Sequence, residues 1–222
     1  APHLMPSLPY DPQKDLSPVY QLSSSPMILY VGSALPVRNV GDLVRLVKGQ
    51  PGRHAYAGHH AGNMAAMTAF KDDMKLDMTY VQYKGGPQAL TDVASGVVTA
   101  MFNDISGSAS LQEAGRVRPL AVMARSRSAL APDVPTVYEE GYKGPVFGLW
   151  NGVFAPAGTP QATVRYLNAE ITKIAAKPAV QERMKKLGLD MYQGSTPESM
   201  AAFIKEETEA LGPILKAQAS GK

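Results

Sequence analysis

The feature that most constrains the fold of this 222-residue chain is an alternation of short apolar runs with helix-like segments. Apolar runs of strand length occupy residues 27–32, 54–57, 78–83, 97–102 and 117–124. Between them, apolar residues recur at helical spacing, as Val40, Leu43 and Val47 do. Such alternation is typical of a parallel sheet that is covered by helices on both faces. The sequence therefore predicts an α/β fold.

Proline and glycine divide the chain into three predicted parts. Residues 1–25 contain five prolines, which disfavour regular structure and indicate an arm that leads into the α/β domain. Residues 26–140 contain the alternating strands and helices. A passage rich in proline and glycine begins at Ala131, and residues 141–222 then resume with two strands, over residues 147–155 and 189–193, and three amphipathic helices. We expect this last part to belong to a second lobe.

Composition and charge exclude several classes of protein. The chain contains no cysteine, which rules out disulfides, thiolate metal sites and cysteine nucleophiles. Its formal net charge of +3 is small for this length and the basic residues form no long run, so we expect no nucleic-acid binding. No apolar stretch approaches the roughly 20 residues that a membrane-spanning helix needs.

Polar loops follow three of the predicted strands, and they are the candidate ligand site. Their residues are His59, His60, Gly62 and Asn63 in the first loop, Tyr83, Lys84, Gly85 and Gly86 in the second, and Asn103 and Asp104 in the third. In folds of this class, ligands bind at the carboxyl ends of the strands. Helix N-termini there offer free backbone N–H groups and the positive end of the helix dipole, which suit a carboxylate.

Single features of these loops are compatible with a simpler interpretation. The paired glycines permit close approach of a ligand to the backbone, and Lys84 carries a charge that complements an anion. The same residues also fit a tight turn with an exposed lysine, and the histidines fit a solvated loop. Convergence of three loops at equivalent strand ends favours a binding site over these alternatives.

The sequence predicts neither an enzyme nor a metal protein. Adjacent residues such as His59 and His60 usually point apart, and no carboxylate stands at the i+4 spacing that would complete a helical metal site. No G-x-S-x-G motif occurs, and no acid, base and nucleophile can be assembled from the candidate residues. We therefore expect no catalytic residues, no metal and no cofactor. Trp150 lies in a predicted strand, where a lone tryptophan is more often part of a core than of a pocket.

A family resemblance emerges from the second loop and the helix after it. The run Tyr-Lys-Gly-Gly-Pro-Gln-Ala-Leu-Thr-Asp from Tyr83 to Asp92 resembles a signature of the extracytoplasmic solute receptors of tripartite tricarboxylate transporters, the Bug family. Further similar segments occupy residues 8–15, 101–102, 115–122, 132–137, 154–160 and 167–171. The resemblance covers essentially the whole chain, in the family's order.

The resemblance implies a periplasmic binding protein of the type II, Venus-flytrap class, with one complete lobe and part of a second. Such a receptor delivers a small organic anion, a di- or tricarboxylate or a similar acid, to a membrane permease and catalyses nothing. By position, the ligand contacts fall on residues 59–63 and 83–86 and near Asn103 and Asp104, with Trp150 close to the cleft.

Two departures from the family pattern shape the remaining expectations. Asn63 and Met64 stand where the family carries a serine and a histidine, so His59 and His60 replace these donors or the pocket takes a different ligand. The chain also begins where the family's second lobe begins, which leaves elements of residues 141–222 without their usual partners. Unpaired strand edges and uncovered helix faces favour association, so we expect a homodimer, an exchange of elements or a fragment.

Two other functions remain as alternatives. A shortened receptor that no longer serves transport would act as an interaction or sensory protein. The effector domain of a transcription regulator has a similar two-lobed fold, but the absence of a helix-turn-helix and the motif match both disfavour it.

Overall fold

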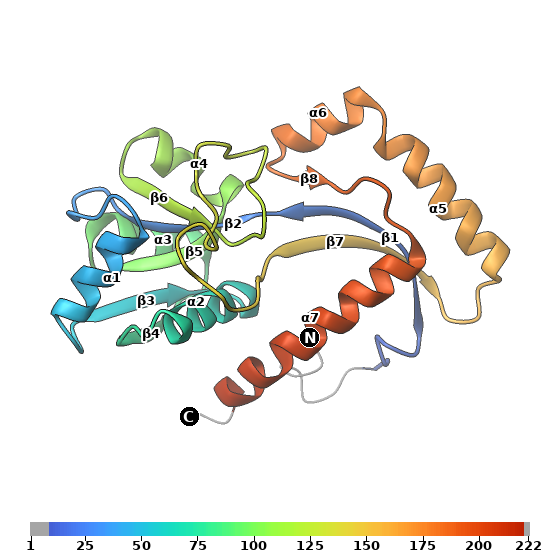
Figure 1. Ribbon diagram of the computed structural model, residues 1–222. Helices are drawn as coiled ribbons and strands as arrows, with labels where there is room; N and C mark the ends of the chain where they lie inside the picture. Colours follow the sequence, from blue (N-terminus) through green and yellow to red (C-terminus); the bar gives the residue numbers. More distant parts are fainter. Residues whose placement is uncertain (1–8, 220–222) are drawn as a thin grey trace. The chain divides into compact units, whose positions relative to one another are not determined.

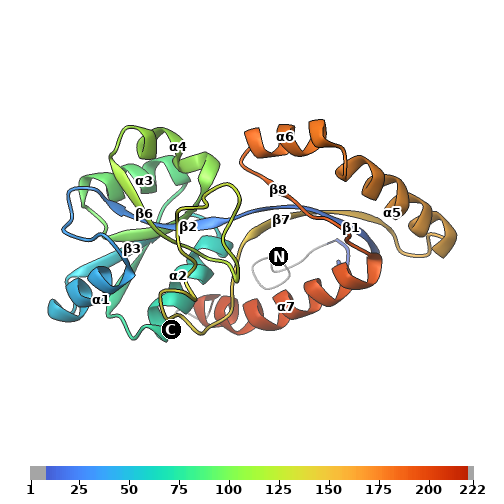
Figure 2. The same cartoon turned by 45° about the horizontal axis from the view of Figure 1, so that its top comes forward.

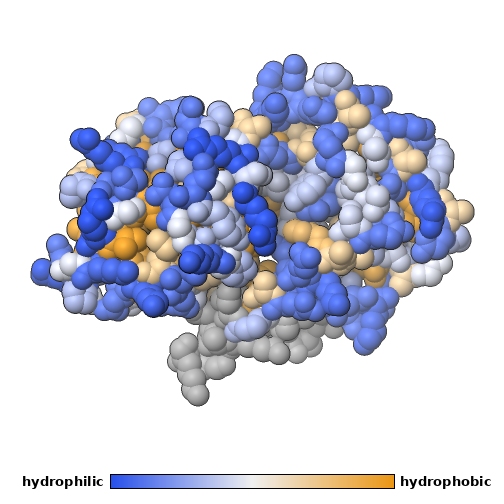
Figure 3. Space-filling model, in the orientation of Figure 1, coloured by the Kyte–Doolittle hydropathy of each residue, from blue (hydrophilic) through white to orange (hydrophobic). Residues whose placement is uncertain are grey.

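The computed structural model describes residues 9–219, which fold into two compact units (Figure 1). The larger unit spans residues 25–149, and the smaller unit combines the chain up to Ser24 with the part that begins at Trp150. No helix within the described residues is long and apolar enough to cross a bilayer. Hydrophilic side chains cover most of the face drawn in Figure 3, with hydrophobic patches between them on both units.

The larger unit is built on a five-stranded sheet with the order β4-β3-β5-β2-β6. Its strands are β2 (Met27–Gly32), β3 (His54–Gly58), β4 (Met78–Gln82), β5 (Ala100–Asp104) and β6 (Val117–Val122). Strand β3 is parallel to β4 and to β5, whereas β2 is antiparallel to both β5 and β6. The prediction of a wholly parallel sheet is therefore wrong.

Strand β2 follows β1 (Leu16–Ser25), a strand of the other sheet, across the single residue Pro26, with no helix between the two strands. Strands β3, β4, β5 and β6 each follow a helix, and all four run in the opposite direction to β2.

Helices cover both faces of the sheet, as the sequence predicted. They are α1 (Val40–Gly49), α2 (Ala61–Asp73), α3 (Gly86–Ser95) and α4 (Ile105–Glu113). Alternate residues of a strand point to opposite faces, so Met101 and Phe102 of β5 lie in different layers. Phe102 meets Phe70 of α2 edge to face, with ring centroids 5.7 Å apart. Met101 lies in the cluster that contains Leu90 and Val93 of α3.

The boundaries of β5 differ from the predicted strand over residues 97–102. The left-handed conformation of Gly96 ends α3, and residues 97–99 form the turn into the strand, with Val97 exposed. Strand β5 therefore starts later and continues to Asp104. This shift places Asn103 inside the sheet, where its side chain is buried, and not in the following loop.

The smaller unit contains a three-stranded sheet with the order β7-β1-β8. Besides β1, its elements are β7 (Leu149–Pro156), β8 (Asp190–Met191), α5 (Gln161–Ala175), α6 (Pro178–Lys186) and α7 (Pro197–Ala219). Helix α7 lies on the opposite side of this sheet from α5 in both views (Figure 1, Figure 2). Val19 and Tyr20 of β1 form a core with Val164 of α5.

The irregular arm predicted for residues 1–25 is thus wrong for its second half. Residues 16–25 form the central strand β1 despite Pro18, and residues 1–8 lie outside the described part of the chain. A proline near the start of a strand removes one donor but leaves the rest of the ladder intact. The residues after Pro18 are mostly buried and indicate a strand, but the number of prolines in residues 1–25 led to the prediction of an irregular arm.

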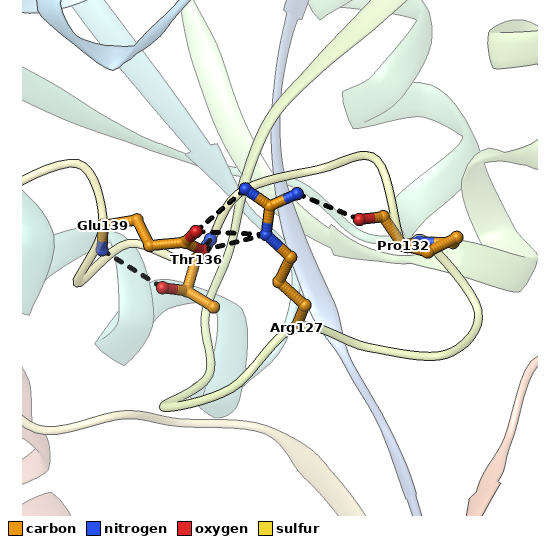
Figure 4. A network of polar contacts seen from close by, with 4 residues as sticks. All are labelled: Arg127, Pro132, Thr136 and Glu139. Atoms are coloured by element: carbon orange, nitrogen blue, oxygen red, sulfur yellow. Dashed lines mark hydrogen bonds and ion pairs between the residues drawn. The ribbon is translucent and has the colours of Figure 1, made fainter.

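A polar network holds the long loop that follows β6 (Figure 4). The Arg127 guanidinium donates to both carboxylate oxygens of Glu139 at 2.8–3.2 Å and to the carbonyl of Pro132 at 3.1 Å. Thr136 and Glu139 exchange backbone-to-side-chain hydrogen bonds of 2.7 and 3.1 Å in a reciprocal capping arrangement. Hydrogen bonding to Arg127 lowers the pKa of Glu139 to about 2.

We expect Glu139→Gln to lower the thermal unfolding midpoint at neutral pH, and the difference from the wild type to shrink in acid. A pKa that is depressed in the folded state stabilises the fold above the ordinary glutamate value, and this stabilisation is lost as the pH falls toward about 2. Circular dichroism melts between about pH 6 and pH 3 test this. Glu140→Gln is the matched control, and a difference that does not change with pH would contradict the prediction.

Candidate functional site

The first candidate loop is organised by the buried side chain of Asn63. Its Oδ1 accepts hydrogen bonds from the backbone N–H groups of His59 and His60, both at 3.1 Å. Its Nδ2 lies 2.7 Å from Nδ1 of His59. Because two N–H donors fix the oxygen, the amide NH₂ must face the histidine ring and donate to it. His59 Nδ1 is therefore an acceptor, and the ring proton resides on Nε2.

The second histidine has a different task, because His60 is the N-cap of α2. Its Nδ1 accepts from the N–H groups of Gly62 at 3.0 Å and Asn63 at 3.3 Å. Both bonds require an unprotonated Nδ1, so this ring also carries its proton on Nε2. Burial lowers the pKa of both His59 and His60, which agrees with two neutral rings.

The second loop is tied to the first at its start. The Tyr83 N–H donates to the carbonyl of Gly58 at 2.8 Å, at the end of β3. The Tyr83 hydroxyl donates to Asp92 at 2.7 Å, and burial raises the pKa of this tyrosine to about 12. Lys84 is exposed. Gly85 is the N-cap of α3 and has no side chain with which to cap the helix.

The third segment combines a buried amide with a helix cap. Nδ2 of Asn103 donates to the hydroxyl of Ser108 at 2.9 Å, and that hydroxyl donates to the carbonyl of Asp104 at 2.9 Å. The Asp104 carboxylate caps α4 by accepting from Gly107 N–H at 2.6 Å and from the Ser106 hydroxyl at 2.7 Å. Oδ1 of Asn103 is buried and has no hydrogen-bond partner among the described residues.

The three segments meet at the N-terminus of α3. A Cβ atom at Gly86 would lie 3.1 Å from Cε1 of His59 and 3.6 Å from Oδ1 of Asn103. His59, Gly85, Gly86 and Asn103 therefore surround one point, and we call these four residues the α3 corner. The predicted proximity of the three loops is observed; that they bind a ligand stays a prediction.

The expectation of free N–H donors at all three helix starts is wrong for α2 and α4. His60 occupies two donors of α2, and Asp104 occupies a donor of α4 with its own carboxylate. Helix α3 is the one of the three that has no side-chain cap. Its first N–H groups belong to Gly86 and Gln88, because Pro87 has none, and they have no partner within the helix.

Trp150 belongs to the smaller unit. Its indole N–H donates to Glu207 of α7 at 2.5 Å, and its ring packs edge to face on Phe203 with centroids 5.4 Å apart. Trp150, Phe154 and Glu207 line a cavity of about 780 Å³, which the sequence did not predict. Burial raises the pKa of Glu207. The role of Trp150 in ligand binding stays a prediction.

The described residues contain no group of three or more histidine or carboxylate side chains that could hold a metal ion. The chemistry of the α3 corner is instead that of neutral hydrogen-bond donors beside one neutral acceptor. Such an arrangement binds an anion through dipoles rather than through an opposite charge.

We expect Asn63→Asp to raise the pKa of His59. One carboxylate oxygen would still accept hydrogen bonds from the two backbone N–H groups. The other would accept a hydrogen bond from a protonated Nδ1 and so favour the charged ring. NMR titration of the histidine rings measures the change. His54, which pairs with Thr99 elsewhere in the sheet, is the internal control. An unchanged titration of His59 would refute the contact between the side chain of residue 63 and Nδ1 of His59.

Comparison with known sequences identifies relatives along the whole chain. The family model described as "Tripartite tricarboxylate transporter family receptor" (TctC) matches residues 1–219. A UPF0065 protein from the tcbD-tcbE intergenic region of Pseudomonas sp. strain P51 is 34% identical over 209 residues, which are 92% of this chain and 61% of that protein. BugT of Bordetella pertussis is 29% identical over 215 residues, which are 96% of this chain and 66% of BugT. The chain spans about three fifths to two thirds of the length of these relatives.

Solved structures give the same result for the fold. Rpa4515 of R. palustris with adipate has a TM-score of 0.76 at 28% identity, with 94% of this chain and 73% of that chain covered. MatC of Rhodopseudomonas palustris with bound malate has a TM-score of 0.74 at 28% identity, with 96% of this chain and 74% of MatC covered. The periplasmic binding protein BugD has a TM-score of 0.76 at 28% identity, with 98% and 74% covered. The expected α/β fold of the periplasmic-binding-protein class is confirmed, and the chain belongs to the family of tripartite tricarboxylate transporter receptors.

Proposed function

We propose that this chain is a periplasmic solute-binding protein that captures a small organic carboxylate at the α3 corner. The observation that carries the proposal is the open N-terminus of α3, which lies beside the neutral ring of His59. The neighbouring helices α2 and α4 fill the equivalent positions with their own side chains. An external acceptor group is therefore best placed at α3.

A carboxylate suits this corner on electrostatic grounds. The N-terminus of a helix carries roughly half a positive charge, and its free N–H groups point toward an approaching anion. The ten residues of α3 are enough to provide this dipole. His59 adds an N–H donor without adding a charge, so binding would draw on several aligned dipoles. The absence of a side chain at Gly86 lets the anion approach the backbone.

The relatives support the same class of ligand. The structures of Rpa4515 and MatC contain adipate and malate, both of which are dicarboxylates. We propose that this chain likewise takes a di- or tricarboxylate or a similar organic anion, delivers it to a membrane permease and performs no catalysis. Calorimetric titration with a panel that includes malate, adipate and citrate tests the ligand class.

We expect Gly86→Ala to weaken carboxylate binding by about 10-fold or more, which corresponds to about 1.4 kcal/mol. The added methyl group would lie 3.1 Å from the His59 ring and would cover the first N–H of α3. Gly49→Ala is the matched control, because a Cβ there has no neighbour within 4 Å. Equal affinities of the two variants for the panel would contradict the placement of the ligand at α3.

A second candidate function, an interaction protein, draws on the surface of the smaller unit. Tyr166 and Ile174 on α5 are 65% and 50% exposed, and Leu187 after α6 is 51% exposed. Leu167 adds a further partly exposed apolar side chain at i+7 spacing from Ile174. Surfaces on which exposed apolar side chains form a contiguous patch tend to associate. We propose that a homodimer forms through this surface.

We expect the wild-type chain to have the mass of a dimer in sedimentation velocity, and the double variant Tyr166→Gln, Ile174→Lys to be a monomer. The substitutions remove the apolar area that would drive association and place a charge in its centre. Arg165→Gln on the same helix is the control and should remain dimeric. A monodisperse wild-type monomer would refute the proposed association and leave the solute-binding proposal unaffected.

A further inference from the structure

Two described residues of the larger unit, His54 and Asn103, have a buried side-chain atom without a hydrogen-bond partner, and Asn103 of β5 is the one that lies at the α3 corner. The residue is 2% exposed, and its Oδ1 has no hydrogen-bond partner among the residues that the structure describes. A buried acceptor left without a donor lowers the stability of the fold. Such an atom is normally satisfied by an ordered water, an ion or a ligand.

The orientation of the Asn103 amide follows from its neighbour Ser108. A serine hydroxyl has one hydrogen, and that of Ser108 is donated to the carbonyl of Asp104. The Ser108 oxygen must therefore accept, and it accepts from Nδ2 of Asn103 at 2.9 Å. Rotating the amide by 180° would place two acceptors against each other. The carbonyl oxygen of Asn103 accordingly faces the α3 corner.

A donor and an acceptor thus flank the same point. The position of a Cβ on Gly86 is 3.3 Å from Nε2 of His59 and 3.6 Å from Oδ1 of Asn103. Nε2 carries the hydrogen, because Nδ1 of this ring accepts from Asn63. Together with the free N–H groups at the start of α3, the corner offers several donors and one acceptor.

A plain carboxylate matches the donors but not the acceptor. Its oxygens carry lone pairs only, so it leaves Oδ1 of Asn103 without a hydrogen and adds a repulsion between oxygens. A hydroxyl on the carbon next to the carboxylate would supply the missing hydrogen. An ammonium group at that place would also donate, but it would bring a positive charge to the positive end of the α3 dipole. The Asp104 carboxylate keeps its charge while it caps α4 and would offset part of the ammonium charge, so aspartate is needed as a probe beside malate.

We infer that the α3 corner selects 2-hydroxycarboxylates over carboxylates that lack the hydroxyl, with Asn103 as the residue that determines this specificity and Ser108 as the residue that positions its amide. This inference rests on the proposed function, because it concerns the same site.

Malate, succinate and aspartate are the probes, because they share four carbons and two carboxylates and differ in one substituent. Calorimetric titration of the full chain should give an affinity for malate at least about 10-fold above that for succinate, the size expected when a hydroxyl satisfies a buried polar group. Aspartate should bind less tightly than malate. Equal affinities for malate and succinate would overturn the inference while leaving the proposed function standing.

Two variants separate the roles of the residues. Asn103→Leu keeps the approximate shape but removes the acceptor, so it should abolish the advantage of malate over succinate, which is read as the ratio of the two affinities. Ser108→Ala frees the amide to rotate and should reduce the ratio of the two affinities without filling the site. Asn39→Leu, which removes the cap of α1, is the matched control and should keep the wild-type ratio.

Each outcome has a definite consequence. If the wild type binds none of the three acids, nor any acid of the wider panel, the proposed function fails and the inference fails with it. If Asn103→Leu does not fold, the ratio of the malate affinity to the succinate affinity still tests the inference in the wild type and in Ser108→Ala. A purely structural role for Ser108 would lower both affinities equally and leave this ratio unchanged. An unchanged ratio in Ser108→Ala would exclude the positioning role.

Discussion

The parallel alignment of β3, β4 and β5 is the constraint on which the α3 corner depends. Parallel neighbours end at the same edge of a sheet, so the segments that follow β3 and β4 and the last residues of β5 lie side by side. The hydrogen bond from Tyr83 N–H to Gly58 carbonyl extends the β3–β4 ladder by one step and fixes the distance between two of these segments. The antiparallel strand β2 pairs with β5 on its other side and leaves this edge unchanged.

Within this frame, the four residues of the α3 corner carry no charge, and the nearest charge that acts on His59 and His60 is the Asp104 carboxylate. Asn63 and His60 use their side chains to satisfy the backbone of their own loop, and in doing so they determine which nitrogen of each histidine ring bears the proton. The one carboxylate of the three segments, Asp104, is engaged by the N-terminus of α4. A bound anion would therefore meet dipoles that are already oriented, which keeps the reorganisation on binding small.

The sequence predicted the convergence of the three polar segments better than the geometry within them. Strand β2 was predicted with its observed bounds, because apolar residues fill it and proline and glycine delimit it, and the three polar segments were found from their place after strands. The direction of β2 was missed because it depends on how the chain enters the sheet, and β1 was missed because prolines precede it. The role of His60 as an N-cap escaped notice because histidine is an uncommon cap. Oδ1 of Asn103 lacks a donor because the Ser108 hydroxyl donates to the Asp104 carbonyl and accepts from Nδ2 of Asn103. Sequence spacing does not predict such a choice of hydrogen-bond partner.

These dependencies also mean that the residues of the corner cannot be exchanged one at a time. Asn63 contacts the ring of His59, and that ring and the Asn103 oxygen approach the same position on Gly86, so a change in one residue alters the setting of the next. Free energies of substitution at contacting polar residues are generally not additive. The loop that carries Asn63 and the two histidines is therefore best regarded as one unit, in which the cap, the amide and the ring depend on one another.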